Sequence, residues 1–139
     1  MGVHQTTVTL AARPRGCHLI TSEIEQAIGE LAPTVTGLAH LFLLHTSASL
    51  SINEDASPDV RGDLSAILDS LVPENGRAYR HTMEGSDDMP AHAKSSLVGV
   101  SLTLPISEGK LAVGTWQGIY LCEHRNRGGQ RSLVITVLS

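Results

Sequence analysis

The sequence predicts an α+β fold: a single compact domain over residues 1–139, with a mostly antiparallel sheet and helices packed on one face of it. Three observations lead to this prediction. Two segments in the first half carry apolar residues at helical spacing. The last third alternates apolar and small polar residues at the period of a strand. Short turns join the strands expected there, and strands joined in this way must be antiparallel.

The size and composition of the chain set limits on this fold. Its 139 residues match one domain, which is enough to bury a core without metal or disulfide support. Hydrophobic residues make up 41% of the chain, as is typical of a globular protein. The cysteines, Cys17 and Cys122, are too few for a disulfide framework, and we expect two small buried thiols.

The charge and hydropathy of the chain argue against two classes of partner. The formal net charge is −4, whereas a broad nucleic-acid surface needs excess positive charge to displace counterions. No apolar run approaches the roughly 20 residues of a membrane span. Residues 1–13 lack the apolar core of a signal peptide. We therefore expect a cytoplasmic protein that binds neither nucleic acid nor membranes.

The first expected elements are a strand and a helix. Residues 3–11 are rich in Thr and Val, which is typical of a strand. Ser22 and Glu25 then have the spacing of a capping box at the start of a helix. Pro33 is expected to end this helix. The apolar face between these points consists of Ile24, Ala27, Ile28 and Leu31.

The next expected elements are two strands and a helix. Residues 38–44 form an almost continuous apolar run, typical of a strand that is covered on both faces. Another strand is expected to follow, through about Ile52. Ser57 and Pro58 then have the chemistry of an N-cap and a first-turn proline. Pro73 closes the helix that begins there, whose apolar side consists of Val60, Leu64, Ile67, Leu68 and Leu71.

A long polar segment separates the two halves of the chain. Residues 73–88 carry almost no large aliphatic side chain, and loops of this length are usually functional or disordered. A short helix is expected over residues 89–97, with Asp88 near its N-cap. Residues 98–104 then alternate like a half-buried strand, and residues 105–109 resemble a turn. Further strands are expected at residues 111–113, 119–122 and 133–138.

Three polar segments at element ends carry the candidate chemistry. His45 follows the apolar strand, and fits a metal ligand, a general base or an ordinary histidine at a sheet edge. Residues 81–92 gather two histidines and three acids, which fit either a binding site or a capped helix after a solvated loop. Residues 123–131 place three arginines around a Gly-Gly turn, which fits a phosphate clamp or a plain hairpin. No standard zinc spacing occurs.

Four runs of residues resemble a known family. They are His45-Thr46-Ser47-Ala48, Asn53-Glu54-Asp55-Ala56, Glu84-Gly85-Ser86-Asp87-Asp88-Met89-Pro90-Ala91-His92 and Gly114-Thr115-Trp116-Gln117-Gly118-Ile119-Tyr120. They resemble the YjbQ-type, or secondary thiamine-phosphate synthase, family over essentially the whole chain. The resemblance implies a compact α+β fold assembled as a homotrimer. It also implies a weak transferase activity, in which a pyrimidine methyl diphosphate joins a thiazole phosphate and pyrophosphate is released.

The resemblance also implies roles for residues at the matching positions. The implied catalytic residues are His45, Asp87, Asp88 and His92. The implied ligands of a divalent metal ion, Mg²⁺ or Zn²⁺, are His45, His92 and His124. The implied contacts to a small phosphorylated substrate are Glu123 and Arg125. Arg131 is a further candidate for this role, because Gly128-Gly129-Gln130 stands where some members of the family carry proline and arginine. Because the sequence shows no recognised pair of nucleophile and base, the same residues also fit a non-catalytic module that binds a metal or a phosphorylated metabolite.

Overall fold

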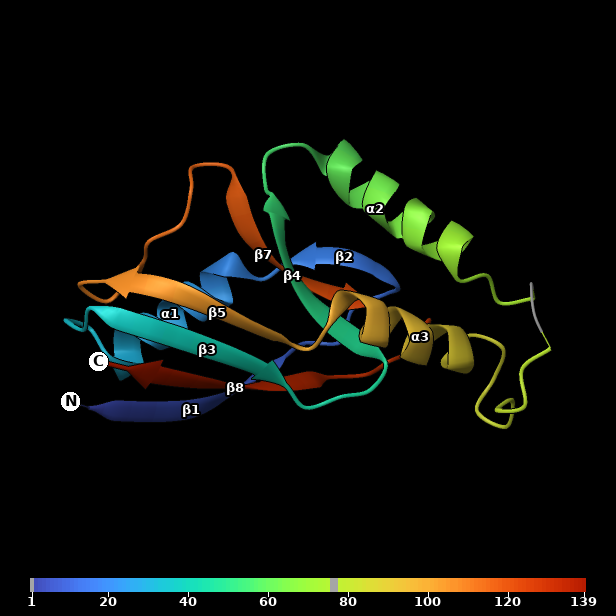
Figure 1. Cartoon of the computed structure of the whole chain (residues 1–139), viewed down its shortest axis with the longest axis horizontal. Coiled ribbons are helices and arrows are strands. Elements are labelled where there is room, and N and C mark those ends of the chain that lie inside the picture. The colour runs from blue at the N-terminus through green and yellow to red at the C-terminus, as the bar shows by residue number, and fades with distance from the viewer. Residues whose placement is uncertain (1, 76–77) are drawn as a thin grey trace.

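The computed structural model describes residues 2–75 and 78–139, and this part of the chain forms eight strands and three helices (Figure 1). None of the described helices combines the length and the apolar character that crossing a membrane requires. In chain order the elements are β1 (Val3–Leu10), β2 (Gly16–Leu19), α1 (Thr21–Leu31), β3 (Gly37–Leu43), β4 (Ala48–Glu54), α2 (Pro58–Leu71), α3 (Asp88–Val98), β5 (Ser101–Ser107), β6 (Lys110–Leu111), β7 (Gln117–Glu123) and β8 (Arg131–Leu138).

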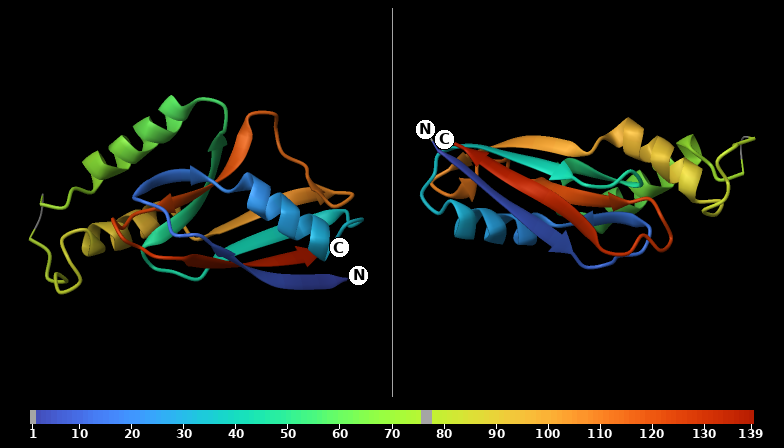
Figure 2. Two further views of the ribbon diagram at one scale, coloured as in Figure 1. Left: turned by 180° about the vertical axis from the view of Figure 1, so that it is seen from behind. Right: turned by 90° about the horizontal axis from the view of Figure 1, so that it is seen from below.

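The strands form two sheets, where the sequence predicted one. The larger sheet has the order β1-β8-β3-β5-β6, and the smaller has the order β2-β7-β4. Every pair is antiparallel, which confirms the predicted α+β class. Strands β1 and β8 pair along their whole length, so the two chain ends lie side by side (Figures 1 and 2).

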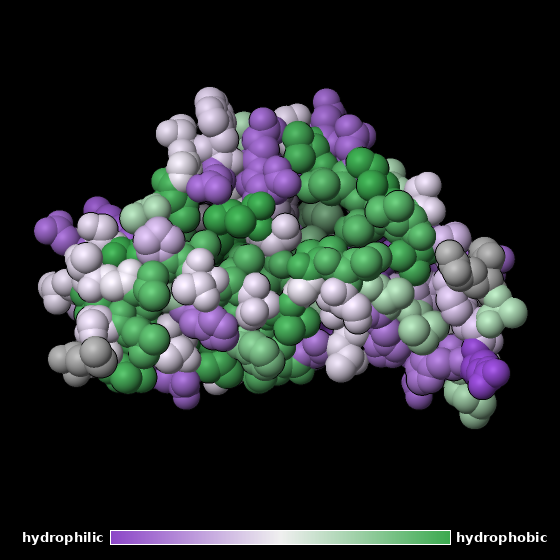
Figure 3. Space-filling model, viewed as in Figure 1, coloured by the Kyte–Doolittle hydropathy of each residue, from purple (hydrophilic) through white to green (hydrophobic). Residues whose placement is uncertain are grey.

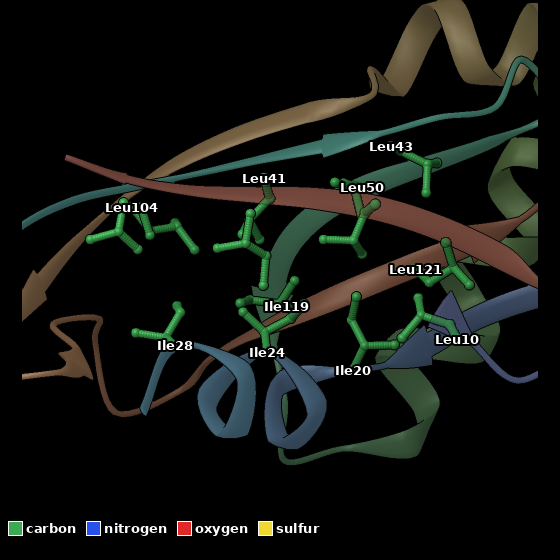
Figure 4. Packing of buried hydrophobic residues seen from close by; sticks show 14 of the residues in the cluster. Leu10, Ile20, Ile24, Ile28, Leu41, Leu43, Leu50, Leu104, Ile119 and Leu121 are labelled. Carbon is green, nitrogen blue, oxygen red and sulfur yellow. The ribbon is translucent and has the colours of Figure 1, made fainter. Parts of the chain in front are cut away.

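The main core lies between the two sheets and helix α1 (Figure 4). Ile24 and Ile28 of α1 are fully buried, which confirms the predicted apolar face of this helix. The strands contribute alternate residues to the same core, among them Leu41 of β3 and Leu121 of β7. Burying each of these side chains contributes roughly 1.5–3 kcal/mol, and this burial is the main force that holds the sheets together.

The capping box predicted for α1 does not form. The helix begins at Thr21, so Ser22 lies inside the first turn, and Ile20 occupies the N-cap without a side-chain hydrogen bond. The hydroxyl oxygen of Thr21 instead accepts a 2.9 Å hydrogen bond from the backbone N–H of Ile119 on β7. The start of this helix is therefore fixed by the neighbouring sheet, a tertiary contact that local spacing does not reveal.

Strand β3 is covered on one face, where the sequence predicted cover on both. Its residues alternate, and Leu41 is buried while Leu38 and Phe42 are 47% and 44% exposed. The smaller sheet and α1 lie on the same side of the larger sheet (Figure 2), so no element in the described part of this chain covers the outer face. The outward-facing apolar side chains of this strand are therefore exposed to solvent in the single chain.

Helix α2 begins as predicted but packs loosely. Ser57 is its N-cap and accepts a hydrogen bond from the backbone N–H of Asp59, and Pro58 is the first helical residue. No residue of α2 is buried, and Ile67 and Leu71 are 54% and 65% exposed. Figure 3 shows apolar surface gathered along α2 and toward α3. The apolar side of this helix is therefore only partly used within one chain.

The segment around α3 departs from the prediction at both ends. The predicted loop 73–88 joins α2 to α3, its described residues form no helix or strand before Asp88, and residues 76 and 77 lie outside the described part. Helix α3 runs through Val98, so the strand predicted from that residue begins only at Ser101. Gly99 makes this break, because its φ of 101° suits a residue without a Cβ.

The turn predicted at residues 105–109 is shorter than expected. Pro105 lies within β5, opposite Leu38, and its carbonyl oxygen accepts a 2.9 Å hydrogen bond from the backbone N–H of Ala112. The turn itself is formed by Glu108 and Gly109, both with positive φ. Proline cannot donate a ladder hydrogen bond, but it fits a strand position from which no such bond is needed.

Candidate functional site

The candidate site is centred on Asp88, the first residue of α3. The carboxylate oxygen Oδ2 of Asp88 lies 2.7 Å from Nε2 of His81 and 3.0 Å from Nε2 of His92. His92 is one helical turn after Asp88, so both side chains leave the same face of α3. His81 arrives from the preceding loop. We refer to these three residues as the Asp88 cluster.

The ring of His92 is oriented by the backbone. Its Nδ1 lies 2.8 Å from the carbonyl oxygen of Thr46, which only accepts hydrogen bonds, so Nδ1 carries a proton. Nε2 of His92 is thereby turned toward the Asp88 carboxylate, and either a second proton or a cation must lie between the two. A histidine whose Nδ1–H is held by a backbone carbonyl is typical of metal ligands.

The donor atoms of the Asp88 cluster fit a divalent metal ion. One ligand atom from each residue lies within 4.8 Å of the other two, and the described residues contain no other such group. Ligands placed about 2.0–2.2 Å from one ion in tetrahedral geometry lie about 3.3–3.6 Å from each other. Two imidazoles and one carboxylate suit Zn²⁺ or Fe²⁺ better than Mg²⁺, which prefers oxygen ligands. The side chain of His81 is 50% exposed, which leaves one side of the cluster open to a substrate.

Arg125 holds the carboxylates of the site in place. Its Nη1 donates a 2.7 Å hydrogen bond to Oδ1 of Asp88, and its Nε donates a 3.0 Å bond to Oδ2 of Asp87. Its Nη2 donates to the carbonyl oxygen of Glu84. The backbone N–H of Asn126 donates a second bond to Oδ2 of Asp87. The guanidinium therefore joins the start of α3 to the segment that follows β7.

Both aspartates are ionised at neutral pH. Burial by itself would raise the pKa of Asp88, but the hydrogen bond from His81 and the charge of Arg125 outweigh it, and the pKa lies below its usual value. Burial acts in the same direction on the pKa of Asp87, and the hydrogen bonds from Asn126 and Arg125 lower it. The site therefore offers a fixed carboxylate to a cation.

Glu123 and Arg131, both predicted phosphate contacts, are paired with each other. Nε of Arg131 lies 2.7 Å from Oε1 of Glu123, and Nη2 lies 2.6 Å from Oε2. Nη2 also donates a 2.9 Å bond to the hydroxyl of Ser47. Glu123 is 1% and Arg131 is 5% exposed. A Cβ at Gly128 would collide with the Glu123 carboxylate, so this buried pair requires glycine there.

The structure does not bring together the metal ligands that the sequence predicted. Only His92 of that set belongs to the Asp88 cluster. Nε2 of His45 accepts a 2.8 Å hydrogen bond from the backbone N–H of Ser132. Nε2 of His124 lies 2.8 Å from the hydroxyl of Ser49, in a buried position where burial and the charge of Lys94 lower the histidine pKa to about 4. His124 is therefore neutral and enclosed.

The cluster contains His81, whereas the predicted ligands were His45, His92 and His124. It lies in the long loop, where no periodicity fixes the direction of a side chain, so its partner could not be identified from the sequence. The sequence feature that points to the cluster is the close spacing of histidines and acids in residues 81–92. Asp88 and His92 are four apart on a helix face, and a further histidine precedes them in the same segment.

A cavity of about 780 Å³ borders the site on the other side of His92. His45 also lines it, so both predicted catalytic histidines face one space. The remaining walls come from the end of β3 and from α3, and they are mainly apolar: Phe42, Leu43, Leu44, Thr46, Ser95, Ser96, Gly99 and Val100. Such a cavity suits the organic part of a substrate whose charged part reaches the Asp88 cluster.

Comparisons with known proteins point to one family. The family model described as UPF0047 protein YjbQ-like matches residues 6–139. The UPF0047 protein YjbQ of Salmonella typhimurium is 54% identical over 96% of both chains. The UPF0047 protein YjbQ of Escherichia coli O157:H7 is 48% identical over the same shares.

Solved structures share the fold. The crystal structure of a conserved yjbq/upf0047 family protein from Clostridium acetobutylicum has a TM-score of 0.83 at 36% identity, and the match covers 96% of this chain and 99% of that one. A YbjQ-like protein from Sulfolobus solfataricus P2 has a TM-score of 0.87 over 99% of this chain and 98% of that one. At 22% identity, the second likeness concerns the fold alone.

Proposed function

The chain belongs to the UPF0047 YjbQ-like family, and from that membership and the site geometry we propose that it is a metal-dependent transferase acting on a small phosphorylated substrate. The leading reaction joins a pyrimidine methyl diphosphate to a thiazole phosphate and releases pyrophosphate. The observation that carries the proposal is the Asp88 cluster, because its two imidazoles and one carboxylate leave an open side. Departure of a diphosphate requires charge stabilisation at such a position.

The residues of the Asp88 cluster would bind the metal ion, and neighbouring residues orient them. Asp88, His81 and His92 would hold the ion, and a bound divalent ion supplies Lewis-acid stabilisation of the negative charge on the departing diphosphate. Arg125 keeps the Asp88 carboxylate ionised and turns its free oxygen toward the histidines. Thr46 fixes the ring of His92 through its carbonyl oxygen. These contacts orient the ligands before any substrate arrives.

The cavity beside His92 supports binding of a heterocyclic ring. His45 lines that cavity, and because its Nε2 accepts a hydrogen bond from the backbone of Ser132, its Nδ1 carries the proton of the neutral ring. Burial and the charge of Arg131 lower the pKa of His45 and favour this neutral form. His45 therefore offers one N–H donor to a ring nitrogen or an oxygen of the substrate.

One observation favours a second candidate, a non-catalytic module that binds a metal or a phosphorylated metabolite. Arg125 donates hydrogen bonds to Asp87 and Asp88, and Arg131 donates hydrogen bonds to Glu123. Neither guanidinium is free to clamp a diphosphate without giving up a carboxylate partner. A module that holds a metal ion needs no such rearrangement.

We also propose that the protein assembles as a homotrimer, as the family resemblance implies. The support within this chain is its uncovered apolar surface. Leu38 and Phe42 are exposed on the outer face of the larger sheet. Patches of this kind on a small protein usually mark an interaction site.

The function is tested with purified protein, both thiamine-phosphate precursors and Zn²⁺, Fe²⁺ or Mg²⁺ in turn. The transferase proposal expects product formation that requires metal and is lost in His92→Ala, while His4→Ala, an exposed histidine on β1, remains active. Metal binding without product would favour the binding module. Turnover that is unchanged in His92→Ala would contradict a role for the Asp88 cluster.

A further inference from the structure

The smaller sheet carries a pair of thiols on the face that α2 covers. Cys17 of β2 lies directly opposite Cys122 of β7 in the antiparallel register. Residues in such pairs have Cα atoms about 4.5 or about 5.5 Å apart, depending on the type of pair. Both separations fall within the roughly 4.4–6.8 Å that a disulfide spans. The backbone is therefore already placed for a disulfide.

The two thiols pack in one buried cluster and have no other assigned role. Both cysteines are free and buried, and Tyr120 packs with them. Neither belongs to the Asp88 cluster. From the register and this packing, we propose that Cys17 and Cys122 are a modification site, which a hydroperoxide oxidises to a reversible disulfide.

The chemistry balances with hydrogen peroxide as the oxidant. The sulfur of Cys17 attacks one peroxide oxygen, the O–O bond breaks, and Cys17 becomes a sulfenic acid as the first water leaves. The sulfur of Cys122 then attacks the sulfur of Cys17, the S–O bond breaks, and the second water leaves as the S–S bond forms. Two thiols lose two electrons and two protons in total, and one peroxide is reduced to two waters.

The surroundings of the two thiols also set the order of attack. Cys17 is 9% exposed and Cys122 is 4% exposed, so an oxidant meets Cys17 first. The neighbouring Cys122 thiol also lowers the pKa of Cys17. Because the thiolate is the nucleophile, Cys17 reacts first and Cys122 resolves the sulfenic acid.

Helix α2 controls access to the pair. A cavity of about 120 Å³ lies between α2 and the sheet, and both thiols line it together with Leu64 and Leu68. Because no residue of α2 is buried, local opening of this helix costs less than unfolding of the core. An ion pair of 2.5 Å between Asp69 of α2 and Lys94 of α3 fixes α2 against α3. A small oxidant therefore reaches the thiols when α2 lifts.

The experiment treats the full chain with hydrogen peroxide, blocks remaining thiols with an alkylating reagent after denaturation, and measures the intact mass without reductant. We expect a monomeric chain that has lost two hydrogen atoms and takes up no reagent, and dithiothreitol should restore two alkylated cysteines. In Cys122→Ser the reaction should stop at a sulfenic acid on Cys17 that dimedone traps. Cys17→Ser should yield no such adduct.

Two results would overturn the proposal, and neither depends on a variant that folds. One is a wild-type chain that still takes up two alkyl groups at peroxide concentrations that oxidise a small-molecule thiol. The other is a disulfide that joins two chains, seen as a dimer on a non-reducing gel. Asp69→Asn provides a check on access, because loosening α2 should accelerate disulfide formation relative to the wild type.

Discussion

Nη1 of Arg125 donates a 2.7 Å hydrogen bond to Oδ1 of Asp88 and leaves only Oδ2 of that carboxylate facing the two histidines. The arginine thus decides which oxygen is available to a cation. It does so from a position 37 residues away in the chain, just beyond the end of β7. The geometry of the proposed metal site therefore depends on a residue that would not touch the metal itself.

Replacing this arginine tests that dependence. Arg125→Lys keeps the charge but cannot hold Asp87 and Asp88 with one planar fork. We expect the dissociation constant for Zn²⁺ to rise by about 10–100-fold, which is the usual cost of losing a group that orients a ligand. Calorimetric titration measures it. Arg127→Lys, a nearby arginine outside these contacts, serves as the control and should bind like the wild type.

Gly128→Ala should destabilise the fold through one contact. The added methyl group would meet the carboxylate of Glu123 and displace it from Arg131, and breaking a buried ion pair costs roughly 3–5 kcal/mol. Urea denaturation measures the change. Gly62→Ala in α2 is the matched control, because no atom lies within 4 Å of its new Cβ. The control should be stabilised by about 0.5–1 kcal/mol, and equal effects in both variants would contradict the collision.

The protein should become less stable as the pH decreases, because His124 is held in its neutral form in the folded state. The folded-state pKa of this residue is about 4, against 6.5 for the free side chain. Unfolding therefore takes up a proton below pH 6.5, and the stability present at neutral pH is lost as pH falls from about 6.5 to about 4. The shift corresponds to about 3 kcal/mol. Denaturation curves at pH 7 and pH 4.5 should show a smaller difference for His124→Gln than for the wild type or His4→Gln.

The homotrimer is tested at the outer face of the larger sheet. Phe42→Asp places a charge where an apolar ring is now exposed, so it should leave the fold of one chain intact and weaken assembly. Sedimentation equilibrium measures the mass of the assembly. Met83→Asp is the control, because Met83 is 95% exposed on the loop before α3. A wild-type protein that sediments as a monomer at micromolar concentration would contradict the proposal.

The sequence predicts those parts of the fold that local chemistry determines. The helical face of Ile24 and Ile28 and the N-cap at Ser57 depend on neighbours within a few residues, and both predictions are confirmed. The division into two sheets depends on pairings such as Val3 with Leu138, which local patterns do not reveal. Pro105 shows the same limit, because only its place in the sheet shows that its missing N–H is tolerated.

The candidate site shows the same division. The clustering of histidines and acids in residues 81–92 indicates Asp88 and His92 as candidate residues, and the resemblance implies their catalytic roles. Their spacing of four on α3 explains why they meet. His81 is not among the predicted ligands, because a loop of irregular backbone gives no rule for where its side chains point. The pairing of Glu123 with Arg131 was missed for a different reason. The sequence of residues 123–131 fits a phosphate clamp or a plain hairpin, whereas the turn between β7 and β8 pairs the two charges with each other.

The proposed metal site is tested by a Zn²⁺ titration, followed by calorimetry, of the wild type, His81→Ala and His45→Ala. The Asp88 cluster requires His81 and does not include His45. We expect one ion bound per chain in the wild type and in His45→Ala, and a dissociation constant at least about 100-fold higher in His81→Ala. Unchanged binding in His81→Ala, or loss of binding in His45→Ala instead, would rule out the Asp88 cluster as the metal site.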